Sequence, residues 1–456
     1  MSITARAKQQ SKRPPRAPAW LPLIGHGRQL LRHRLRFLRE ARAYGPVVRV
    51  GLGPMETYLV NDHRLLHRML VAEAAQFPRG VHFRKARAVV GDGLVTADGA
   101  AHRRQRRLVL PVFSRKRMHG YSDVMRHAAV ERIASLPYDR PIELKAEFVS
   151  LAITIATRAL FSSDRGIDAV SIVKRTLPVI TRAVSMRAMD PTGLVEHLPL
   201  PVNRHFDAIM QEMYGFIDEM IASYRRTEQT GVDLLSLLML STDEDTGRSL
   251  TDREVRDEVI TILLSSAETT ALAMSWCCHE LGRHPEVFEA VRAEVDRVLT
   301  DGEPPTHEQL GELALTRRVV KEALRLYPPT SFLSRTCRED AELGGYHIPA
   351  GSTIVYSLYA QHRDPRLFTD PDTFDPDRWL PERSGDATPE AFMPFGEGVH
   401  RCIGEQFAWA EAMTSIAFIA AHRDLRPVNS DAVRPTGTVM LEPHGLSVVM
   451  PRRQPA

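Results

Sequence analysis

The residues with the clearest chemistry surround Cys402, in the run Phe395-Gly396-Glu397-Gly398-Val399-His400-Arg401-Cys402-Ile403-Gly404. Glycines in this run let the backbone pass close under a flat group, because glycine has no Cβ atom. The apolar helical stretch that follows points free N–H groups at the sulfur and favours a thiolate. A thiolate on haem iron promotes O–O cleavage of bound dioxygen. The run therefore predicts a haem-binding loop with Cys402 as the iron ligand, whereas a free core cysteine would not need these neighbours.

The run resembles the iron-ligand loop of the cytochrome P-450 family of haem-thiolate monooxygenases, which reads Phe-x-x-Gly-x-(Arg/His)-x-Cys-x-Gly. Phe395, Gly398, His400, Cys402 and Gly404 fill this pattern. The resemblance implies a mainly α fold with small β-sheets, the cytochrome P-450 fold. It also implies haem b (iron protoporphyrin IX) as cofactor and insertion of one oxygen atom of O2 into a C–H bond. Phe395 and His400 are then expected to contact the haem.

A second motif places an acid and a base on a helix that ends before Pro328 and Pro329. Glu322 and Arg325 share a face, and such a pair is usually a solvated ion pair worth less than ~1 kcal/mol. The resemblance implies a buried cluster instead, joined by Arg378 from a later loop. We expect this cluster to lock the segment that leads to the haem loop, and removing its acid to yield protein without haem.

A long helix is predicted between a capping box at Thr251–Glu254 and the pair His284–Pro285. Apolar residues lie on nearly every side of it, which predicts a buried helix. The polar residues in its central run 265–270, Ser-Ser-Ala-Glu-Thr-Thr, therefore need an explanation. Hydroxyls that bond back to carbonyls one turn earlier are one reason. The resemblance implies a compatible second one, in which Thr269 and Glu268 relay protons to bound oxygen.

Two serines in this run depart from the family pattern. Ser266 stands where glycine is usual, and Ser265 where alanine is common. An added hydroxyl either narrows the groove beside the iron or holds another water.

Residues 101–107, Ala-His-Arg-Arg-Gln-Arg-Arg, form a basic run that by charge alone would be a solvated helix face. His102 and Arg106 are four residues apart and share one face. The resemblance implies that these two side chains bind the haem propionates, together with Arg335 and His400, because guanidinium groups suit carboxylates.

The chain has no room for a flavin or reductase domain, so the resemblance implies electron supply from a ferredoxin and an NAD(P)H-dependent ferredoxin reductase. We expect unpaired arginines to steer an acidic ferredoxin to the protein. These are Arg103, Arg104 and Arg107. A nucleic-acid binder would need groove-reading motifs or stacking aromatics, which the sequence lacks. A non-catalytic haem sensor stays open, although it has no use for an acid–threonine pair.

Composition fits a catalytic protein with a large core: 456 residues, 43% hydrophobic and 25% charged. The four cysteines provide neither a disulfide framework nor a zinc spacing. Residues 1–42 carry eleven Lys and Arg against Glu40 alone, within a net charge of only +4. We expect residues 1–20 to be a flexible basic segment and residues 21–456 to form one cytochrome P-450 domain, present as a monomer.

The sequence shows neither a signal peptide nor a run of about twenty apolar residues, which predicts a cytoplasmic enzyme without a transmembrane anchor. In residues 30–38, Leu31, Leu35 and Leu38 are expected on one helical face among arginines. Such a helix can lie on a membrane, and packing on the protein body is the favoured reading. Residues 47–50 and 57–60 are expected to pair as a hairpin, and a second β region covers residues 344–356.

Apolar side chains in segments that cover the distal pocket in the family suit a compact hydrocarbon substrate. They are Phe83, Met186, Met189, Leu263, Phe332 and Leu333. Runs such as 198–206, 343–346 and 375–383 resemble the actinobacterial oxidases of cyclic sesquiterpenes, of the albaflavenone synthase and pentalenene oxygenase type. This resemblance implies terpene hydroxylation in secondary metabolism. Fatty-acid, steroid or polyketide hydroxylation remains an alternative within the family.

Overall fold

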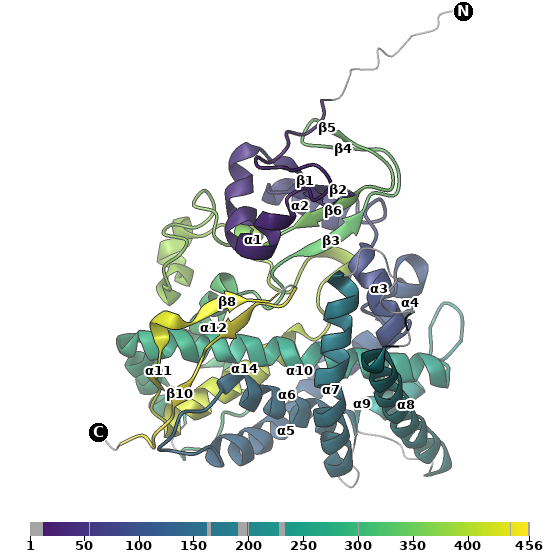
Figure 1. The fold of residues 1–456 in the computed structure, drawn as a ribbon. Helices are drawn as coiled ribbons and strands as arrows, with labels where there is room; N and C mark the ends of the chain where they lie inside the picture. Colours follow the sequence, from purple (N-terminus) through teal and green to yellow (C-terminus); the bar gives the residue numbers. More distant parts are fainter. Residues whose placement is uncertain are drawn as a thin grey trace, which may run out of the picture. The chain divides into compact units, whose positions relative to one another are not determined.

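The computed structural model describes residues 12–53, 55–161, 166–189, 198, 200–227, 233–299, 301–437 and 439–454. The chain forms two compact units, shown in Figure 1. Unit 1 comprises Met1–Val81, Phe332–Pro371 and Thr388–Arg401, and unit 2 comprises His82–Ser331, Asp372–Ala387 and Cys402–Ala456. Helices dominate and the sheets are small, which confirms the predicted fold class. The single domain expected over residues 21–456 stays a prediction.

Unit 1 is built on a four-stranded sheet with the order β1-β2-β6-β3. Its strands are β1 (Val47–Leu52), β2 (Met55–Val60), β6 (Thr353–Tyr356) and β3 (Leu333–Thr336). The predicted hairpin is confirmed, because β1 and β2 pair antiparallel with Val47 opposite Val60. Strand β6 runs parallel to β2 and antiparallel to β3. The second predicted β region, residues 344–356, contains β5 (Tyr346–Ile348) and β6. Strand β5 pairs with β4 (Ala341–Leu343) in a separate ribbon, whereas β6 belongs to the four-stranded sheet.

Alternation along β1 explains how both faces of this sheet are buried. Val47 joins one apolar cluster, whereas Val48 and Val50 join another on the opposite face. The second cluster is closed by helix α1 (Gly27–Ala41), through Phe37 and Leu38. On the first face lie α2 (His63–His67) and the π-helix η2 (Arg68–Ala72). Helix α13 (Leu358–Gln361) contributes Leu358 to the first cluster and Ala360 to the second.

Helix α1 corrects one expectation from the sequence. The backbone of His33 is non-helical (φ −142°, ψ 39°), so a kink divides the helix. Leu38 is buried while Leu31 is 83% exposed, and the two therefore do not share one face as the spacing predicted. The favoured packing on the protein body holds through Leu30, Phe37 and Leu38, whereas Leu31 is exposed to solvent.

Within the segment that the sequence predicts to be flexible, residues 14–17 lie along β1 and Lys12 lies along β5. The Ala17 N–H donates to the Arg49 carbonyl (3.0 Å), and the Arg49 N–H donates to the Pro15 carbonyl (2.8 Å). Ala17 is buried in the unit 1 core. Residues 1–11 of the predicted segment lie outside the described residues.

Unit 2 is organised around helix α10 (Asp252–Arg283), which crosses it in Figure 1. Thr251 and Glu254 form the predicted capping box, and the helix ends at His284 before Pro285. These bounds confirm the predicted long helix. It packs against α6 (Leu144–Leu160), α12 (Ala314–Leu326) and α14 (Glu405–His422).

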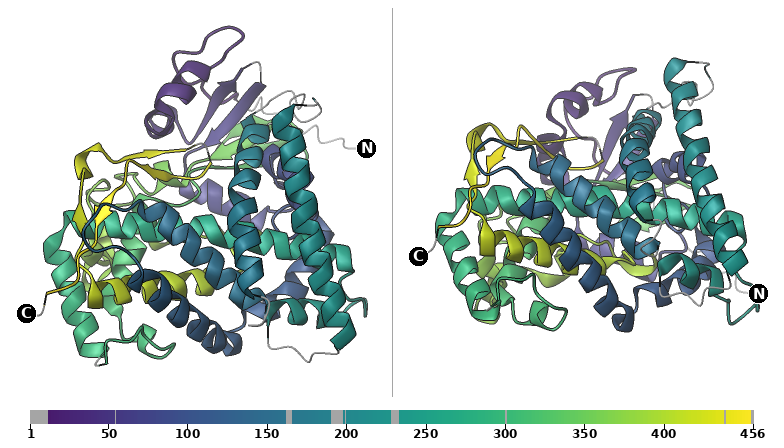
Figure 2. Two further views of the ribbon diagram at one scale, coloured as in Figure 1. Left: turned by 60° about the horizontal axis from the view of Figure 1, so that its bottom comes forward. Right: turned by 90° about the horizontal axis from the view of Figure 1, so that it is seen from below.

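The other helices of unit 2 surround this core, and Figure 2 shows α7 and α8 side by side. They are α3 (Val81–Val90), α4 (Gly99–Val109), α5 (Arg115–Ala134), α7 (Gly166–Met189), α8 (Pro201–Thr227), α9 (Leu234–Leu240) and α11 (Pro285–Val298). Two short ribbons pair β7 (Arg426–Pro427) with β10 (Val448–Val449) and β8 (Arg434–Thr436) with β9 (Glu442–His444).

Among the described residues, α10 is the one helix long and apolar enough to cross a membrane, with a mean hydropathy of 1.3 over its most apolar window. This helix is not a run of about twenty apolar residues, because Ser265, Ser266, Glu268, Thr269 and Thr270 interrupt it. Its window is 67% buried inside the protein, against α6, α12 and α14. Length and composition alone do not separate a buried core helix from a spanning one.

Candidate active site

Cys402 differs from the other cysteines by its exposure. It is exposed, whereas Cys277, Cys278 and Cys337 are buried. Burial raises the pKa of Cys337 to about 11 and raises the pKa of Cys277 well above its ordinary value. Thiols with raised pKa values are poor metal ligands at neutral pH, because the thiolate is the ligand form. Cys402 lies just before Gly404, the residue that precedes the first turn of α14, where helix N–H groups favour an anion.

Gly398 has a local packing reason in addition to the predicted approach of the loop to a flat group, which stays a prediction. In unit 1, Gly398 has φ +65°, and a Cβ atom there would lie 2.0 Å from the Leu70 carbonyl oxygen. Gly398 therefore allows the turn Gly398–His400 to approach η2. Gly404 in unit 2 has no such demand, because its nearest neighbour to a Cβ would be Phe113 at 3.9 Å. Phe395 and His400 are half-buried members of unit 1.

Glu322, Arg325 and Arg378 meet in a buried cluster inside unit 2. The Glu322 carboxylate accepts from Arg325 Nε (2.9 Å) and Nη2 (2.8 Å), and from Arg378 Nε (2.8 Å). Two further donors are the Trp379 indole N–H (2.9 Å) and the Asp375 backbone N–H (3.2 Å). All three charged side chains are at most 2% exposed. The cluster joins α12 to the segment Pro376–Trp379, and sequence reasoning missed the indole.

The hydroxyls at the centre of α10 bond back to the helix itself. Thr269 Oγ1 donates to the Ser265 carbonyl (2.7 Å), and Ser266 Oγ donates to the Ile262 carbonyl (2.8 Å). These bonds use the hydroxyl protons and leave the oxygen lone pairs available as acceptors. The added hydroxyl of Ser266 is therefore held against the helix backbone.

Glu268 lies beside two charged side chains that sequence reasoning missed. Lys145 Nζ of α6 is 3.8 Å from Glu268 Oε1 and 2.5 Å from Glu442 Oε2 of β9. Burial raises the pKa of Glu268, Lys145 opposes this rise, and Glu442 adds to it. The carboxyl therefore keeps its proton to a higher pH than a free glutamate. No local sequence signal links these three positions, which come from separate elements.

On α4, His102 is 2% exposed and Arg106 is half-buried, within unit 2. Arg335 belongs to unit 1, on β3, where it is 4% exposed and its guanidinium lies 5.7 Å from the Tyr356 ring centroid. The structure thus brings His102 and Arg106 together on one helix. It places Arg335 in the other unit, together with His400.

The expectation of unpaired arginines on α4 was wrong for two of three. Arg104 donates to Glu254 (2.7 Å), the capping acid of α10. Arg107 lies 2.9 Å from both Asp243 and Asp245. Among the described residues, Arg103 alone of the three is exposed and lacks an ion-pair partner. The pairing partners lie more than a hundred residues away in sequence, where a local charge pattern cannot reveal them.

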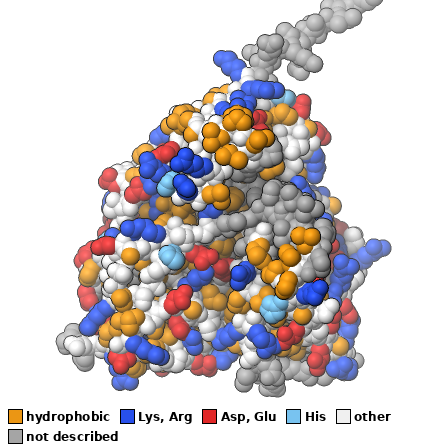
Figure 3. All heavy atoms as spheres, viewed as in Figure 1, with side chains coloured by type: hydrophobic (Ala, Val, Ile, Leu, Met, Phe, Trp, Pro, Cys, Tyr) orange, Lys and Arg blue, Asp and Glu red, His pale blue; other side chains and the backbone are white. Residues whose placement is uncertain are grey.

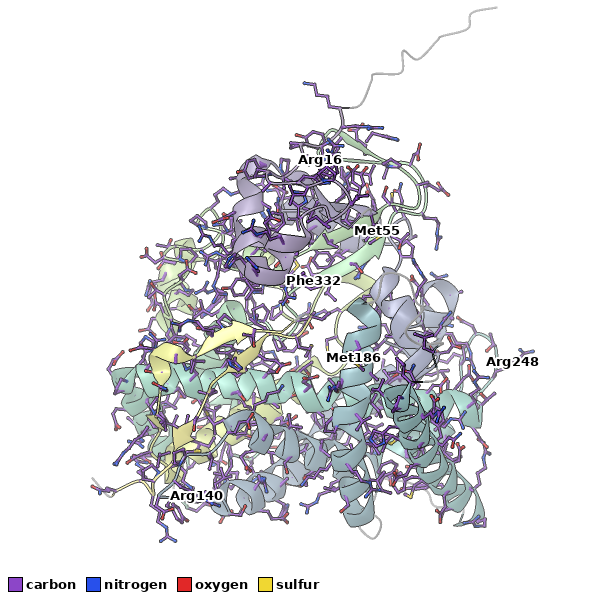
Figure 4. All side chains as sticks on the ribbon, in the orientation of Figure 1. Arg16, Met55, Arg140, Met186, Arg248 and Phe332 are labelled. Carbon is purple, nitrogen blue, oxygen red and sulfur yellow. The ribbon has the colours of Figure 1, made fainter. Side chains whose placement is uncertain are left out.

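The predicted substrate residues divide between the units. In unit 2, Leu263 of α10 is 2% exposed, and Phe83 of α3 and Met186 of α7 are half-buried (Figure 4). The Met189 side chain lies outside the described residues. In unit 1, Leu333 packs against the sheet core, which favours the packing role for that residue. Phe332 is half-buried, with the Arg34 guanidinium 5.9 Å from its ring centroid.

Two buried acids of unit 2 escaped sequence reasoning. Glu258 of α10 is fully buried and accepts one bond, from the Leu94 N–H (3.1 Å), while its second oxygen has no partner among the described residues. Burial raises its pKa to about 8. Glu411 of α14 is also fully buried, and burial raises its pKa to about 8 although Thr270 opposes the rise. The sequence signal that could have revealed both residues is a glutamate within an otherwise apolar helical stretch.

An iron porphyrin needs an available thiolate and basic groups for its carboxylates. Cys402 is an exposed thiol beside a helix start, and α4 presents His102 and Arg106 on one side. These features of unit 2 fit the cofactor that the sequence predicts.

Comparison with known proteins agrees with this chemistry. Residues 15–447 match the family model for cytochrome P450. The chain is 40% identical to cyclooctatin synthase of Streptomyces melanosporofaciens, covering 92% of this chain and 91% of that protein. It is 35% identical to pentalenene oxygenase of Streptomyces avermitilis, covering 90% and 93%. A crystal structure titled cytochrome P450DA heme domain aligns with a TM-score of 0.87 at 26% identity, covering 97% of this chain and 98% of that one. The chain therefore belongs to the cytochrome P450 family and is a haem-dependent monooxygenase.

Proposed function

We propose that this monooxygenase hydroxylates a cyclic terpene, with a sesquiterpene as the favoured substrate, in secondary metabolism. The observation that carries the proposal is the exposed thiol of Cys402, in a chain whose similarity to two actinobacterial terpene oxidases extends over nine tenths of its length. Fatty acids, steroids and polyketides are the competing substrates, and they suit the same apolar side chains.

The cofactor we propose is haem b, with Cys402 as its iron ligand. His102 and Arg106 would bind its propionates from unit 2, and Arg335 and His400 would do so from unit 1. Phe395 would lie against the macrocycle. Bound in this way, haem supplies activation of O2 and insertion of one oxygen atom into a C–H bond.

We propose that Glu268 and Thr269 supply the protons for this reaction. Glu268 suits the role because burial raises its pKa, so that the carboxyl holds its proton to a higher pH than a free glutamate does. Glu442 is 38% exposed and shares Lys145 with Glu268, so these two side chains offer a route for proton recovery from solvent. The Thr269 oxygen, whose proton is bonded to Ser265, can accept a hydrogen bond from a water beside it.

Electrons would come from a ferredoxin and its NAD(P)H-dependent reductase, and the protein would act as a cytoplasmic monomer. Because Arg104 and Arg107 are tied to acids, a ferredoxin surface on α4 would rely on Arg103. Charge reversal at Arg103 should then slow reduction while substrate affinity stays unchanged. Equal effects on reduction and on affinity would contradict this surface.

The iron ligand is tested by Cys402→Ser, with Cys278→Ala as the matched control in a buried cysteine. The control should show the absorption of a thiolate-bound haem carbonyl after reduction with carbon monoxide, and Cys402→Ser should lose it together with turnover. A Cys402→Ser protein that still hydroxylates substrate would refute the assignment.

The substrate class is tested by titrating the purified holoenzyme with cyclic sesquiterpenes, linear fatty acids and steroids, and following the spin-state change of the haem. We expect cyclic sesquiterpenes to bind more tightly than linear fatty acids and steroids. Tighter binding of a fatty acid or a steroid would replace the proposed substrate while leaving the iron ligand unaffected.

A further inference from the structure

Large apolar side chains are gathered on one exposed face of unit 1. In the loop before α1, Trp20 is 41% exposed, Leu21 42%, Leu23 85% and Ile24 48%, and Leu31 on α1 is 83% exposed. We call these five side chains the apolar knob. Single exposed apolar residues are ordinary, but a contiguous group marks an interaction site. In Figure 3, hydrophobic and basic side chains lie side by side on this upper part of unit 1.

The loop that carries the knob is fixed to the sheet. The ring of His26 is fully buried, where Nδ1 accepts from the Gly51 N–H (2.9 Å) and Nε2 donates to the Ala17 carbonyl (3.0 Å). Gly25 has φ +58°, and a Cβ atom there would lie 2.6 Å from the Gly51 carbonyl oxygen. The backbone N–H and carbonyl groups of Leu21 and Gly25 bond to each other. The knob therefore stands on a rigid base.

The backbone of this loop is strained at two residues that are not glycine. Leu23 has φ +68°, and Ala19 in the same loop has φ +63°. Side chains rarely adopt this left-handed conformation, because the Cβ atom meets the following carbonyl oxygen. A strained backbone that leaves a large apolar side chain exposed points to a functional role for this loop.

Basic side chains surround the knob. Arg28 and Arg32 are exposed on the first turns of α1 and have no ion-pair partner among the described residues. The Arg16 guanidinium lies 4.7 Å from the Trp20 ring centroid and 3.2 Å from Glu56. Glu40, the one acid in residues 1–42, is paired with Arg36. The face thus combines protruding apolar groups with a surplus of positive charge.

We propose that this face docks on an anionic lipid bilayer, with the apolar knob in the headgroup region and Arg28 and Arg32 against lipid phosphates. Charge complementarity selects this occupant, because apolar side chains flanked by unpaired cations are what interfacial binding requires. A second copy of the chain would bring two basic faces together. A protein partner would need a socket for Leu23, whereas a bilayer accepts a protruding side chain without one. The protein would thus bind peripherally to a membrane, through unit 1.

The test uses full-length holoenzyme and sedimentation with two kinds of vesicle, phosphatidylcholine alone and phosphatidylcholine mixed with phosphatidylglycerol. The protein should sediment with the mixed vesicles at least tenfold more strongly, and added salt should release it. Leu23→Ser with Leu31→Ser should weaken binding at least tenfold. Both residues are highly exposed, so the fold should persist, as circular dichroism would verify.

Two matched controls lie in unit 2. Leu240→Ser changes another exposed leucine (65% exposed), and Arg140→Glu (Figure 4) matches the test variant Arg28→Glu. Both controls should bind vesicles like the original protein, and Arg28→Glu should not. Equal binding by the knob variant and the Leu240→Ser control would overturn the proposal. So would a concentration-dependent dimer that the knob variant abolishes, because the face would then bind a second copy.

Discussion

Replacing Glu322 by alanine is the perturbation with the largest effect that the structure predicts. Five donors converge on this carboxylate: three guanidinium N–H groups, the Trp379 indole and one backbone N–H. The guanidinium groups of Arg325 and Arg378 are both at most 2% exposed. Removing one partner of a buried pair costs about 3–5 kcal/mol, because an uncompensated charge stays buried. Here two cations lose the same partner, which places the cost at the upper end of that range.

Such a loss is a large share of the ~5–15 kcal/mol that stabilises a typical domain. Urea denaturation followed by circular dichroism, with Glu322→Ala beside the original protein, measures it. Asp296→Ala is the matched control, because it breaks an Arg453 pair of equally short contacts (2.6 and 2.7 Å) in which Asp296 is 53% exposed. That pair should contribute less than ~1 kcal/mol. Glu322→Ala should also be purified without haem.

The proposed role of Glu322 would be refuted if Glu322→Ala lowered the free energy of unfolding no more than Asp296→Ala, or if the variant kept its full haem content. Glu322→Gln separates charge from shape. It keeps one acceptor oxygen but removes the negative charge, so its cost should lie between those of the other two variants. A glutamine variant as stable as the original protein would mean that shape, and not charge, holds the cluster.

Three further outcomes follow from single positions. The pKa of Glu258 is raised from 4.5 to about 8 in the folded protein. The folded state then keeps a proton that the unfolded chain releases, so the free energy of unfolding should fall between pH ~5 and ~8, and Glu258→Gln should flatten this fall in urea titrations. Gly398→Ala should lower the free energy of unfolding by about 1–3 kcal/mol, while Gly404→Ala, with no close neighbour, should leave it unchanged or raise it slightly; equal values would contradict the packing argument. Lys145→Met should raise the pKa of Glu268 and move the pH profile of turnover upward, and an unmoved profile would exclude Glu268 as the titrating acid.

The features that the sequence predicted correctly are set by local signals. The start of α10 depends on the Thr251–Glu254 capping box and its end on Pro285, so both ends were predictable within a few residues. The β1–β2 hairpin is equally local, since two apolar runs flank a glycine-containing turn. The kink in α1, by contrast, has no local sequence signal. His33 lies inside a continuous helical pattern, and nothing in the residue types around it marks the break.

The features that the sequence missed depend on contacts between distant segments. Arg104 and Arg107 read as part of a solvated charge run, yet their acids come from the region before and at the start of α10. Glu268 was predicted as a proton carrier, but its environment depends on Lys145 and Glu442, which lie on other elements. Sequence spacing shows which residues share a helix face. It does not show which face of another element will meet them.

The acids of α10 can be sorted by what their carboxylates bind. Asp257 and Glu258 accept the backbone N–H groups of Asp92 and Leu94, and a Cβ atom at Gly91 would lie 2.3 Å from the Asp257 carboxyl carbon. These two acids therefore fix the loop that leads into α4, which is a structural role. Glu268 instead contacts a lysine that a second, more exposed acid shares. A carboxyl in contact with charged groups near solvent can exchange protons without disturbing the backbone, so the two positions should respond oppositely to removal of the acid. Glu258→Gln should change stability and its pH dependence while turnover keeps its pH profile, and Glu268→Gln should alter that profile with little loss of stability.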